Sequence, residues 1–167
     1  ESKHYTVTGA ESGYITEING LSEYDGGSQS GWNGFINDWC ATEGLSAFTI
    51  QSRKLQNGDE ITMRYSCSWG ADLGSDWSSN DTRLNELSFN HGELNQTFSK
   101  DTKEYTLTLP KDENQIMVTP HAINKNFQVR VFKNQYTPEQ NGAEYKRSSS
   151  IPVADGDCLY IGVGNPT

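Results

Sequence analysis

The most suggestive side chains of this 167-residue sequence are four tryptophans, all of which precede residue 83. Trp32 and Trp77 each lie between small or polar residues, which favours partial exposure of both rings. Exposed aromatic faces stack on sugars or flat ligands and anchor protein interfaces. Tyr24 and Asp25 precede a Gly-Gly pair in a loop that could join the same site. We therefore take these four residues as candidate ligand-binding residues.

A structural alternative exists for the same tryptophans. In Ile61–Trp69, apolar and polar residues alternate, and this pattern puts Cys67 and Trp69 on the apolar face of a strand. Trp39 fits a core face in the same way. Under this alternative all four indoles fill a small core or an interdomain contact. Both interpretations stay open at the level of sequence.

The cysteines allow a disulfide in the first half of the chain. A bond between Cys40 and Cys67 would close a loop of about 27 residues and contribute about 3.5 kcal/mol in the chain-entropy model. The alternative is that Cys67 is a buried free thiol. Cys158 alternates with the apolar residues of its own segment, so we expect it to be partly exposed and unpaired, or able to crosslink two chains.

Carboxylates crowd one Gly/Ser-rich loop. Asp72, Asp76 and Asp81, together with Asn80, could supply oxygen ligands to Ca²⁺ on a flexible segment. Their spacing does not match an EF-hand loop. Turn-forming Asp and Asn residues explain the same composition without a cation. Calcium is thus a weak candidate ligand, and no other cofactor is expected.

Nothing in the sequence favours an enzyme or a nucleic-acid partner. The three histidines are scattered, and no His-Glu-x-x-His, Cys-x-x-Cys, nucleophile-elbow or phosphate-loop motif is present. A formal charge of -9 disfavours nucleic acid, because phosphate contacts need clustered Lys and Arg. No apolar run reaches the roughly 18 residues of a membrane span. We therefore expect a non-catalytic protein with no membrane span in this chain.

Charge and composition divide the chain near residue 82. Residues 1–82 hold four basic and 12 acidic residues, whereas residues 83–167 hold nine and ten. The segment 70–82 is rich in Gly, Ser, Asp and Asn and is typical of a loop or linker. The sequence thus predicts two small domains, residues 1–82 and 83–167.

Alternating apolar and polar residues predict strands in both parts. The expected strands span 14–18, 35–39, 61–69, 105–109, 116–119, 127–131 and 159–163, and Pro110 and Pro120 are expected to end two of them. A helix is expected only over 44–55. Short strands separated by turn residues indicate a mainly β protein with an all-β sandwich.

Four ordered blocks resemble the transcobalamin-like C-terminal domain family over about residues 5–76. These blocks are Gly13–Leu21, Ser30–Asn37, Leu55–Ile61 with Arg64–Cys67, and Gly70–Gly74. The resemblance implies a small β-rich domain of β-grasp character. In bacteria such domains are common in secreted and cell-surface proteins, and in animal cobalamin carriers the related domain closes over the corrinoid. The sequence departs from the family between Trp39 and Lys54, where it is longer and less regular.

The second half resembles the cadherin-like β-sandwich domain of bacterial surface proteins over about residues 84–164. The matching stretches are Leu84–Phe89, Gly92–Leu94, Phe98–Thr106, Val118–Ala122 and Asp155–Asp157. This immunoglobulin/cadherin-like domain is usually a repeated spacer or adhesion module, and no catalytic activity is implied.

Together these observations predict an extracellular binding or adhesion fragment of a bacterial cell-surface or secreted protein. The first domain would bind a ligand, protein or glycan, and the second would act as a spacer. A corrinoid-type small-molecule binder, a carbohydrate-binding module and a purely structural stalk are the alternatives. Acidic loops disfavour an anionic partner in every case.

Overall fold

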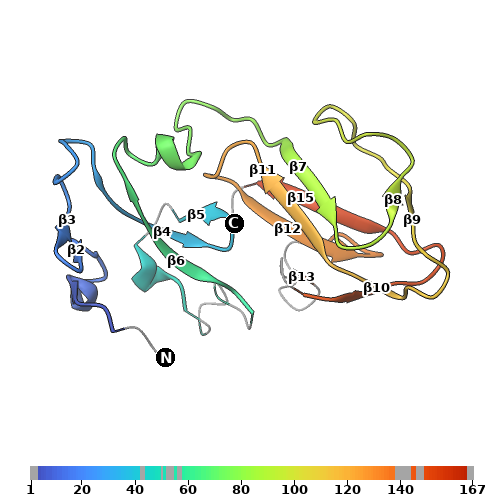
Figure 1. The fold of residues 1–167 in the computed structure, drawn as a ribbon, viewed down its shortest axis with the longest axis horizontal. Helices are drawn as coiled ribbons and strands as arrows, with labels where there is room; N and C mark the ends of the chain where they lie inside the picture. Colours follow the sequence, from blue (N-terminus) through green and yellow to red (C-terminus); the bar gives the residue numbers. More distant parts are fainter. Residues whose placement is uncertain are drawn as a thin grey trace. The chain divides into compact units, whose positions relative to one another are not determined.

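The protein is a mainly β chain that divides into two compact units, residues 1–79 and 80–167 (Figure 1). The computed structural model describes residues 4–41, 44–49, 51, 55, 58–137, 144–145 and 149–164. Among these residues the regular elements are short strands and 3₁₀ turns, with no α-helix. The mainly β fold class predicted from the sequence is confirmed. No helix in the described part of the chain has the length and apolar character needed to span a membrane.

Unit 1 contains two three-stranded antiparallel sheets. The first has the order β1-β2-β3 and the second the order β5-β4-β6. The strands are β1 (Val7–Thr8), β2 (Glu17–Ile18), β3 (Leu21–Ser22), β4 (Gly31–Ile36), β5 (Trp39–Cys40) and β6 (Ile61–Ser66). The central pair is β4 and β6, with Gly31 opposite Ser66 at one end and Ile36 opposite Ile61 at the other. This register fixes which side chains share each face of the sheet.

The predicted strand over 35–39 is instead a hairpin. Asn37 has φ 58°, a left-handed conformation that Asn tolerates better than most residues, and the chain turns back at Asn37 and Asp38. As a result β5 pairs with the end of β4, and Phe35 lies opposite Cys40. The Asn37 N–H donates to the Glu60 carbonyl over 2.7 Å, which ties the turn to the start of β6.

The core of unit 1 lies on both faces of the second sheet. On one face Ile36 and Trp39 pack with Phe48, and the rings of Trp39 and Phe48 meet edge to face at 5.3 Å. On the other face Phe35 is fully buried, and the Arg64 guanidinium lies over its ring at 4.3 Å. The aromatic content of unit 1 thus supplies a core that its few aliphatic residues would not fill.

The helix expected over 44–55 does not form at the described positions. Only a 3₁₀ turn, Leu45–Ala47, is present there, and Phe48 and Thr49 follow it in irregular conformation. Residues 42–43, 50, 52–54 and 56–57 lie outside the described residues. The β-branched Thr49 disfavours a helix, and burial of Phe48 against Trp39 holds this segment instead.

Unit 2 is built from short antiparallel sheets around one core. The strands are β7 (Leu84–Phe89), β8 (Glu93–Leu94), β9 (Leu107–Thr108), β10 (Gln115–Ile116), β11 (Val118–Ala122), β12 (Gln128–Lys133), β13 (Glu144–Tyr145), β14 (Ile151–Pro152) and β15 (Leu159–Gly164). β7 pairs with β11, and β12 lies between β13 and β15. The predicted strands over 127–131 and 159–163 are confirmed as β12 and β15, which pair over six residues.

The core of unit 2 is mainly aliphatic. Ile116, Val118, Val131 and Ile151 are buried together, and partly buried side chains such as Leu87 and Phe89 of β7 pack against them. Pro120 does not end a strand as predicted, because it lies within β11 opposite Leu87. A proline fits there because its missing N–H faces away from β7 and takes no hydrogen bond from that pairing.

Candidate functional site

Two tryptophans of unit 1 are the most exposed large hydrophobic side chains of the described residues. Trp69 is 64% and Trp77 62% exposed. The Trp77 Nε1–H donates to the Trp69 carbonyl over 3.0 Å, so the second indole is fixed against the backbone of the first. A fixed, exposed aromatic ring loses little side-chain entropy when a ligand binds. Trp69 and Trp77 therefore form the centre of the candidate site, which we call the aromatic loop (residues 66–77).

The aromatic loop is built by its own polar groups. Ser66, fully buried at the end of β6, accepts from the N–H groups of Ser68 (3.1 Å) and Gly70 (2.6 Å). Its hydroxyl also donates to Asp72 Oδ1, and Asp72 Oδ2 accepts from the Cys67 N–H over 2.8 Å. Gly70, with φ 83°, then leads into the 3₁₀ turn Ala71–Leu73. These contacts turn the chain out of the sheet and leave Trp69 outside it.

Two aromatic residues of the site have left-handed backbone conformations. Trp69 has φ 53° and Tyr24 has φ 69°, both unusual for bulky residues. The Trp69 N–H donates to the Gln29 carbonyl over 2.9 Å, and the Tyr24 N–H to the Ser30 carbonyl over 3.1 Å. Such strain costs on the order of 1–3 kcal/mol per residue and persists only where surrounding contacts impose it. Strain at two exposed aromatic residues marks this end of unit 1 as a functional candidate.

The loop that carries Tyr24 is tied to the sheet by Tyr65. The Tyr65 hydroxyl accepts from the Gly26 N–H over 3.0 Å and donates to the Ser22 carbonyl over 2.7 Å. The Tyr24 side chain itself is 60% exposed. Since residues 22–30 and the aromatic loop are joined at Gln29 and Trp69, Tyr24 and the two indoles come from neighbouring loops.

The other two predicted ligand residues have structural contacts instead. Trp32 is half-buried, its Nε1–H donates to the Leu21 carbonyl over 2.9 Å, and its ring meets Tyr65 edge to face at 5.3 Å. Asp25 is exposed, and its Oδ2 accepts from the Ser22 N–H over 2.7 Å, as in a turn. Of the four candidates, Tyr24 and Trp77 present exposed rings, whereas Trp32 and Asp25 hold the loops.

The predicted core position of Trp69 is wrong. The alternation of apolar and polar residues continues to residue 69 in the sequence. The strand β6 nevertheless ends at Ser66, because the buried Ser66 hydroxyl binds the backbone of the following turn. A period-two pattern has no meaning beyond the last paired residue. The signal that could have located the site is the sequence Trp69-Gly70, where a glycine permits the left-handed turn.

The site is negatively charged. Residues 22–30 and 66–79 contain Glu23, Asp25, Asp72 and Asp76 and no Lys, Arg or His. Hydrogen bonds lower the pKa of Asp72 below its usual range; the bond from the Cys67 N–H has the larger effect and that from the Ser66 hydroxyl the smaller one. A hydrogen bond from the Ser78 hydroxyl lowers the pKa of Asp76 in the same way. Both carboxylates are therefore ionised at neutral pH. An anion is disfavoured here.

The three weak calcium candidates have protein partners. Asp72 is held by Ser66 and Cys67, and Asp76 accepts from the N–H and hydroxyl of Ser78. Asp81 belongs to unit 2 and pairs with Arg83 over 2.7 Å, which lowers its pKa to about 2. Among the described residues no group of three potential metal ligands is found.

Of the two alternatives for Cys40 and Cys67, the disulfide is not formed, and all three cysteines are free thiols. Cys40 lies opposite Phe35, whereas Cys67 follows Ser66, which lies opposite Gly31. Cys40 and Cys67 are therefore five residues apart along the direction of β4. At the rise per residue of a β-strand, this is a distance of about 16 Å. Cysteines with Cα atoms more than about 7 Å apart cannot be bridged. Cys40 is buried, and Cys67 and Cys158 are exposed.

Comparison with known proteins places a family match on the first unit. Residues 1–67 match the family model of a domain of unknown function, DUF4430. This domain is associated with transcobalamin-like domains. The DUF4430 match includes Tyr24 and Trp32 and ends before Trp69 and Trp77. No curated protein and no solved structure matches the chain significantly.

Proposed function

We propose that the chain is a non-catalytic binding fragment of a bacterial cell-surface or secreted protein. Unit 1 is the ligand or partner module, and unit 2 is a spacer of cadherin-like type. The observation that carries the proposal is the pair of exposed indoles: that of Trp77 is held by a hydrogen bond to the Trp69 carbonyl, and Trp69 has a left-handed backbone. A protein gains nothing in stability from exposing such rings, so their fixed exposure favours recognition.

The chemistry of the aromatic loop favours a neutral glycan as the ligand. Indole faces stack on the apolar faces of sugar rings. The ionised Asp72 and Asp76 beside them are acceptors for sugar hydroxyls and repel anions. Tyr24 on the adjoining loop adds a third exposed ring.

The purely structural stalk is the less favoured alternative. A stalk with no ligand would bury its tryptophans in the core or between domains. Trp39 is buried in the core of unit 1 at 4% exposure, whereas Trp69 and Trp77 lie outside that core. Their exposure supports a binding role for unit 1.

A corrinoid is the second candidate ligand, and the DUF4430 match favours it through the association of that domain with transcobalamin-like domains. A flat, apolar macrocycle would also stack on exposed indoles. Titration with cobalamin, followed by tryptophan emission with correction for absorbance, separates the two ligands. An unchanged corrected signal at millimolar cobalamin would exclude the corrinoid and leave the glycan proposal intact.

A glycan array tests the proposal directly. The wild-type chain should bind a set of neutral glycans, and Trp69→Ala and Trp77→Ala should each weaken binding at least tenfold, as expected for central aromatic contacts. Tyr5→Ala is the matched control, because Tyr5 is a similarly exposed ring that precedes β1. Absence of any glycan hit, or equal loss in the control, would contradict the proposed ligand.

A further inference from the structure

A second interaction surface lies in unit 2, at the outer edge of β7. β7 pairs with β11 alone among the described strands, so its other edge is open. The Asn90 N–H donates to the Met117 carbonyl over 3.2 Å, which makes Asn90 and Met117 a hydrogen-bonded pair. Hydrogen-bonded and non-hydrogen-bonded pairs alternate along an antiparallel ladder. The N–H and C=O groups of Leu87 and Phe89 therefore point away from β11, toward the open edge.

The outer edge of β11 is blunted, in contrast to that of β7. Pro120 lies opposite Leu87, at a non-hydrogen-bonded pair by the same alternation. The backbone nitrogen of Pro120 therefore points to the outer edge of β11. Because proline has no N–H, it cannot donate a hydrogen bond to a further strand at this position. Pro120 thus removes one outward donor from the edge of β11, whereas β7 contains no proline.

A shallow hollow of about 470 Å³ adjoins the open edge. Its walls come from β7 on one side and from the segments 92–94 and 96–98 on the other. The lining side chains include Leu87, Phe89, Leu94 and Phe98, and Glu93 is the one charged residue among them. Glu86 of β7 is exposed as well, and Arg83 before β7 is paired with Asp81 and Asp101, so acidic groups outnumber basic ones beside the edge.

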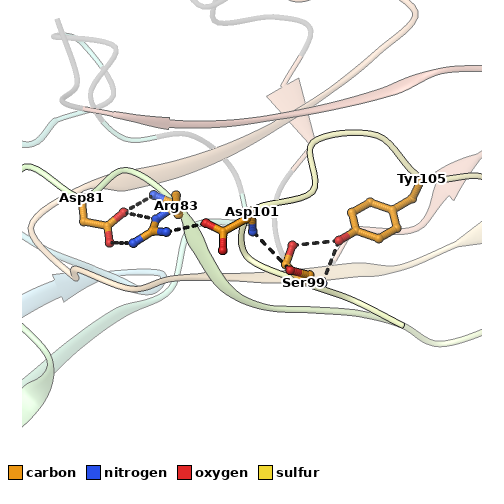
Figure 2. A network of polar contacts seen from close by, with 5 residues as sticks. All are labelled: Asp81, Arg83, Ser99, Asp101 and Tyr105. Carbon is orange, nitrogen blue, oxygen red and sulfur yellow. Dashed lines mark hydrogen bonds and ion pairs between the residues drawn. The ribbon is translucent and has the colours of Figure 1, made fainter. Parts of the chain in front are cut away.

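The wall of the hollow opposite β7 is held by a chain of polar contacts (Figure 2). Ser99 donates its N–H to the Tyr105 hydroxyl, which donates to the Ser99 carbonyl, each over 2.8 Å. Asp101 pairs with Arg83, the residue directly before β7. Phe98 stacks on Tyr105 at 5.9 Å. These contacts connect the wall to the start of β7.

We propose that the edge of β7 binds an extended peptide strand with an apolar side chain and a neighbouring basic residue. The outward N–H and C=O groups of Leu87 and Phe89 would pair with the peptide backbone, as in β-strand addition. The apolar side chain would enter the hollow beside Leu94 and Phe98. Charge complementarity to Glu93 and Glu86 selects a basic peptide rather than an acidic one. This surface is independent of the aromatic loop.

The test uses the full chain, ¹⁵N-labelled, and the probe peptide acetyl-KVTIKVTK-amide. We expect saturable shifts of the amide signals of Leu87 and Phe89. The same peptide N-methylated at alternate residues, which cannot complete the backbone pairing, should produce none. An acidic counterpart, acetyl-EVTIEVTE-amide, should bind at least fivefold more weakly. Equal shifts with the N-methylated peptide, or no shifts at millimolar probe, would overturn the proposal.

A charge variant supplies the matched control. Glu93→Lys should weaken binding of the basic peptide roughly two- to fivefold, as expected for loss of one exposed ion pair. Glu104→Lys changes an exposed residue outside the hollow and should leave the affinity unchanged. An equal loss of peptide affinity in both variants would indicate a general electrostatic attraction and would contradict the proposed site. Concentration-dependent dimerisation through the same amides without peptide would instead assign the edge to a second copy of the chain.

Discussion

The two units differ in their tryptophan content and in the make-up of their buried clusters. Unit 1 contains all four tryptophans and most of the net negative charge, and two of those indoles are exposed on a loop fixed by Ser66 and Asp72. Unit 2 contains no tryptophan, and its main buried cluster of Ile116, Val118, Val131 and Ile151 is aliphatic, although Phe132 is also fully buried. The comparison shows that a small domain can fill its core with a few large rings and present others to solvent.

The largest contrast concerns thiol reactivity. Cys67 and Cys158 are exposed and should react with a thiol reagent at once, whereas Cys40 is buried, and burial raises the pKa of its thiol. Reaction of Cys40 requires local or global opening, so we expect its rate to be lower by a factor of about 10³ or more.

Non-reducing mass spectrometry after pulsed alkylation measures this difference. The expected spectrum shows three free thiols, two of them labelled early. A Cys40–Cys67 crosslink, or early labelling of Cys40, would contradict the register of β4 with β5 and β6.

Substitution of one buried ring in each unit sharpens the comparison. Phe35→Ala in unit 1 and Phe132→Ala in unit 2 each remove a fully buried side chain and should lower the free energy of unfolding by about 3–5 kcal/mol. Every tryptophan lies in unit 1, so tryptophan emission should report the loss of stability in Phe35→Ala. Far-UV circular dichroism should report the loss of stability in both variants. An equal shift of the emission midpoint in Phe132→Ala would contradict separate cores.

Removal of the Ser66 hydroxyl should have a smaller effect. Ser66→Ala leaves the Gly70 N–H without its buried acceptor and should cost about 1–3 kcal/mol. It should also make Trp69 more mobile. We expect a red shift of the tryptophan emission and an exchange-broadened NMR signal of the Trp69 indole N–H. Ser28→Ala, at an exposed serine of the same unit, is the control and should change neither quantity.

Acid should affect the two units through different carboxylates. The folded-state pKa of Asp72 lies below 3.8 because of hydrogen bonds from Cys67 and Ser66. A lowered folded pKa means that its stabilisation is complete above pH 3.8 and is lost as the pH falls below that value. Arg83 lowers the pKa of Asp81 to about 2, so its contribution to unit 2 is lost between pH 3.8 and about 2.

Carboxyl-detected NMR titration of the two side chains checks this prediction. Asp72→Asn should remove the acid-dependent change in Trp69 emission, and Asp81→Asn should leave it intact. A Trp69 response above pH 5 would be incompatible with a lowered pKa of Asp72.

Regular alternation explains which elements were predictable from the sequence. β12 and β15 are long strands that pair over six residues, and the alternating apolar residues Val129, Val131, Ile161 and Val163 define them. The hairpin at Asn37, the continuation of β11 through Pro120 and the exit of the chain at Ser66 were not predictable. Each depends on a contact with a residue remote in sequence or on a single backbone angle. A period-two pattern contains no information on either of these.

The candidate site was predicted in part for a similar reason. Trp77 and Tyr24 are surrounded by polar or flexible residues in the sequence, and both rings are exposed. Trp69 was missed because it follows an alternating strand, and Trp32 was included although its indole donates to the Leu21 carbonyl. Local composition indicates exposure, but it does not show which indole has a hydrogen-bond partner in another strand.

One measurement tests the central claim most directly, namely that unit 1 presents Trp69 and Trp77 as a fixed binding surface. In the chain labelled with 5-fluorotryptophan, four ¹⁹F signals are expected and can be assigned by Trp→Phe substitution. We predict large solvent-isotope shifts for Trp69 and Trp77, a small one for Trp39, and selective movement of the first two when a glycan ligand is added. Small isotope shifts at both exposed positions, or ligand shifts confined to other tryptophans, would contradict the account.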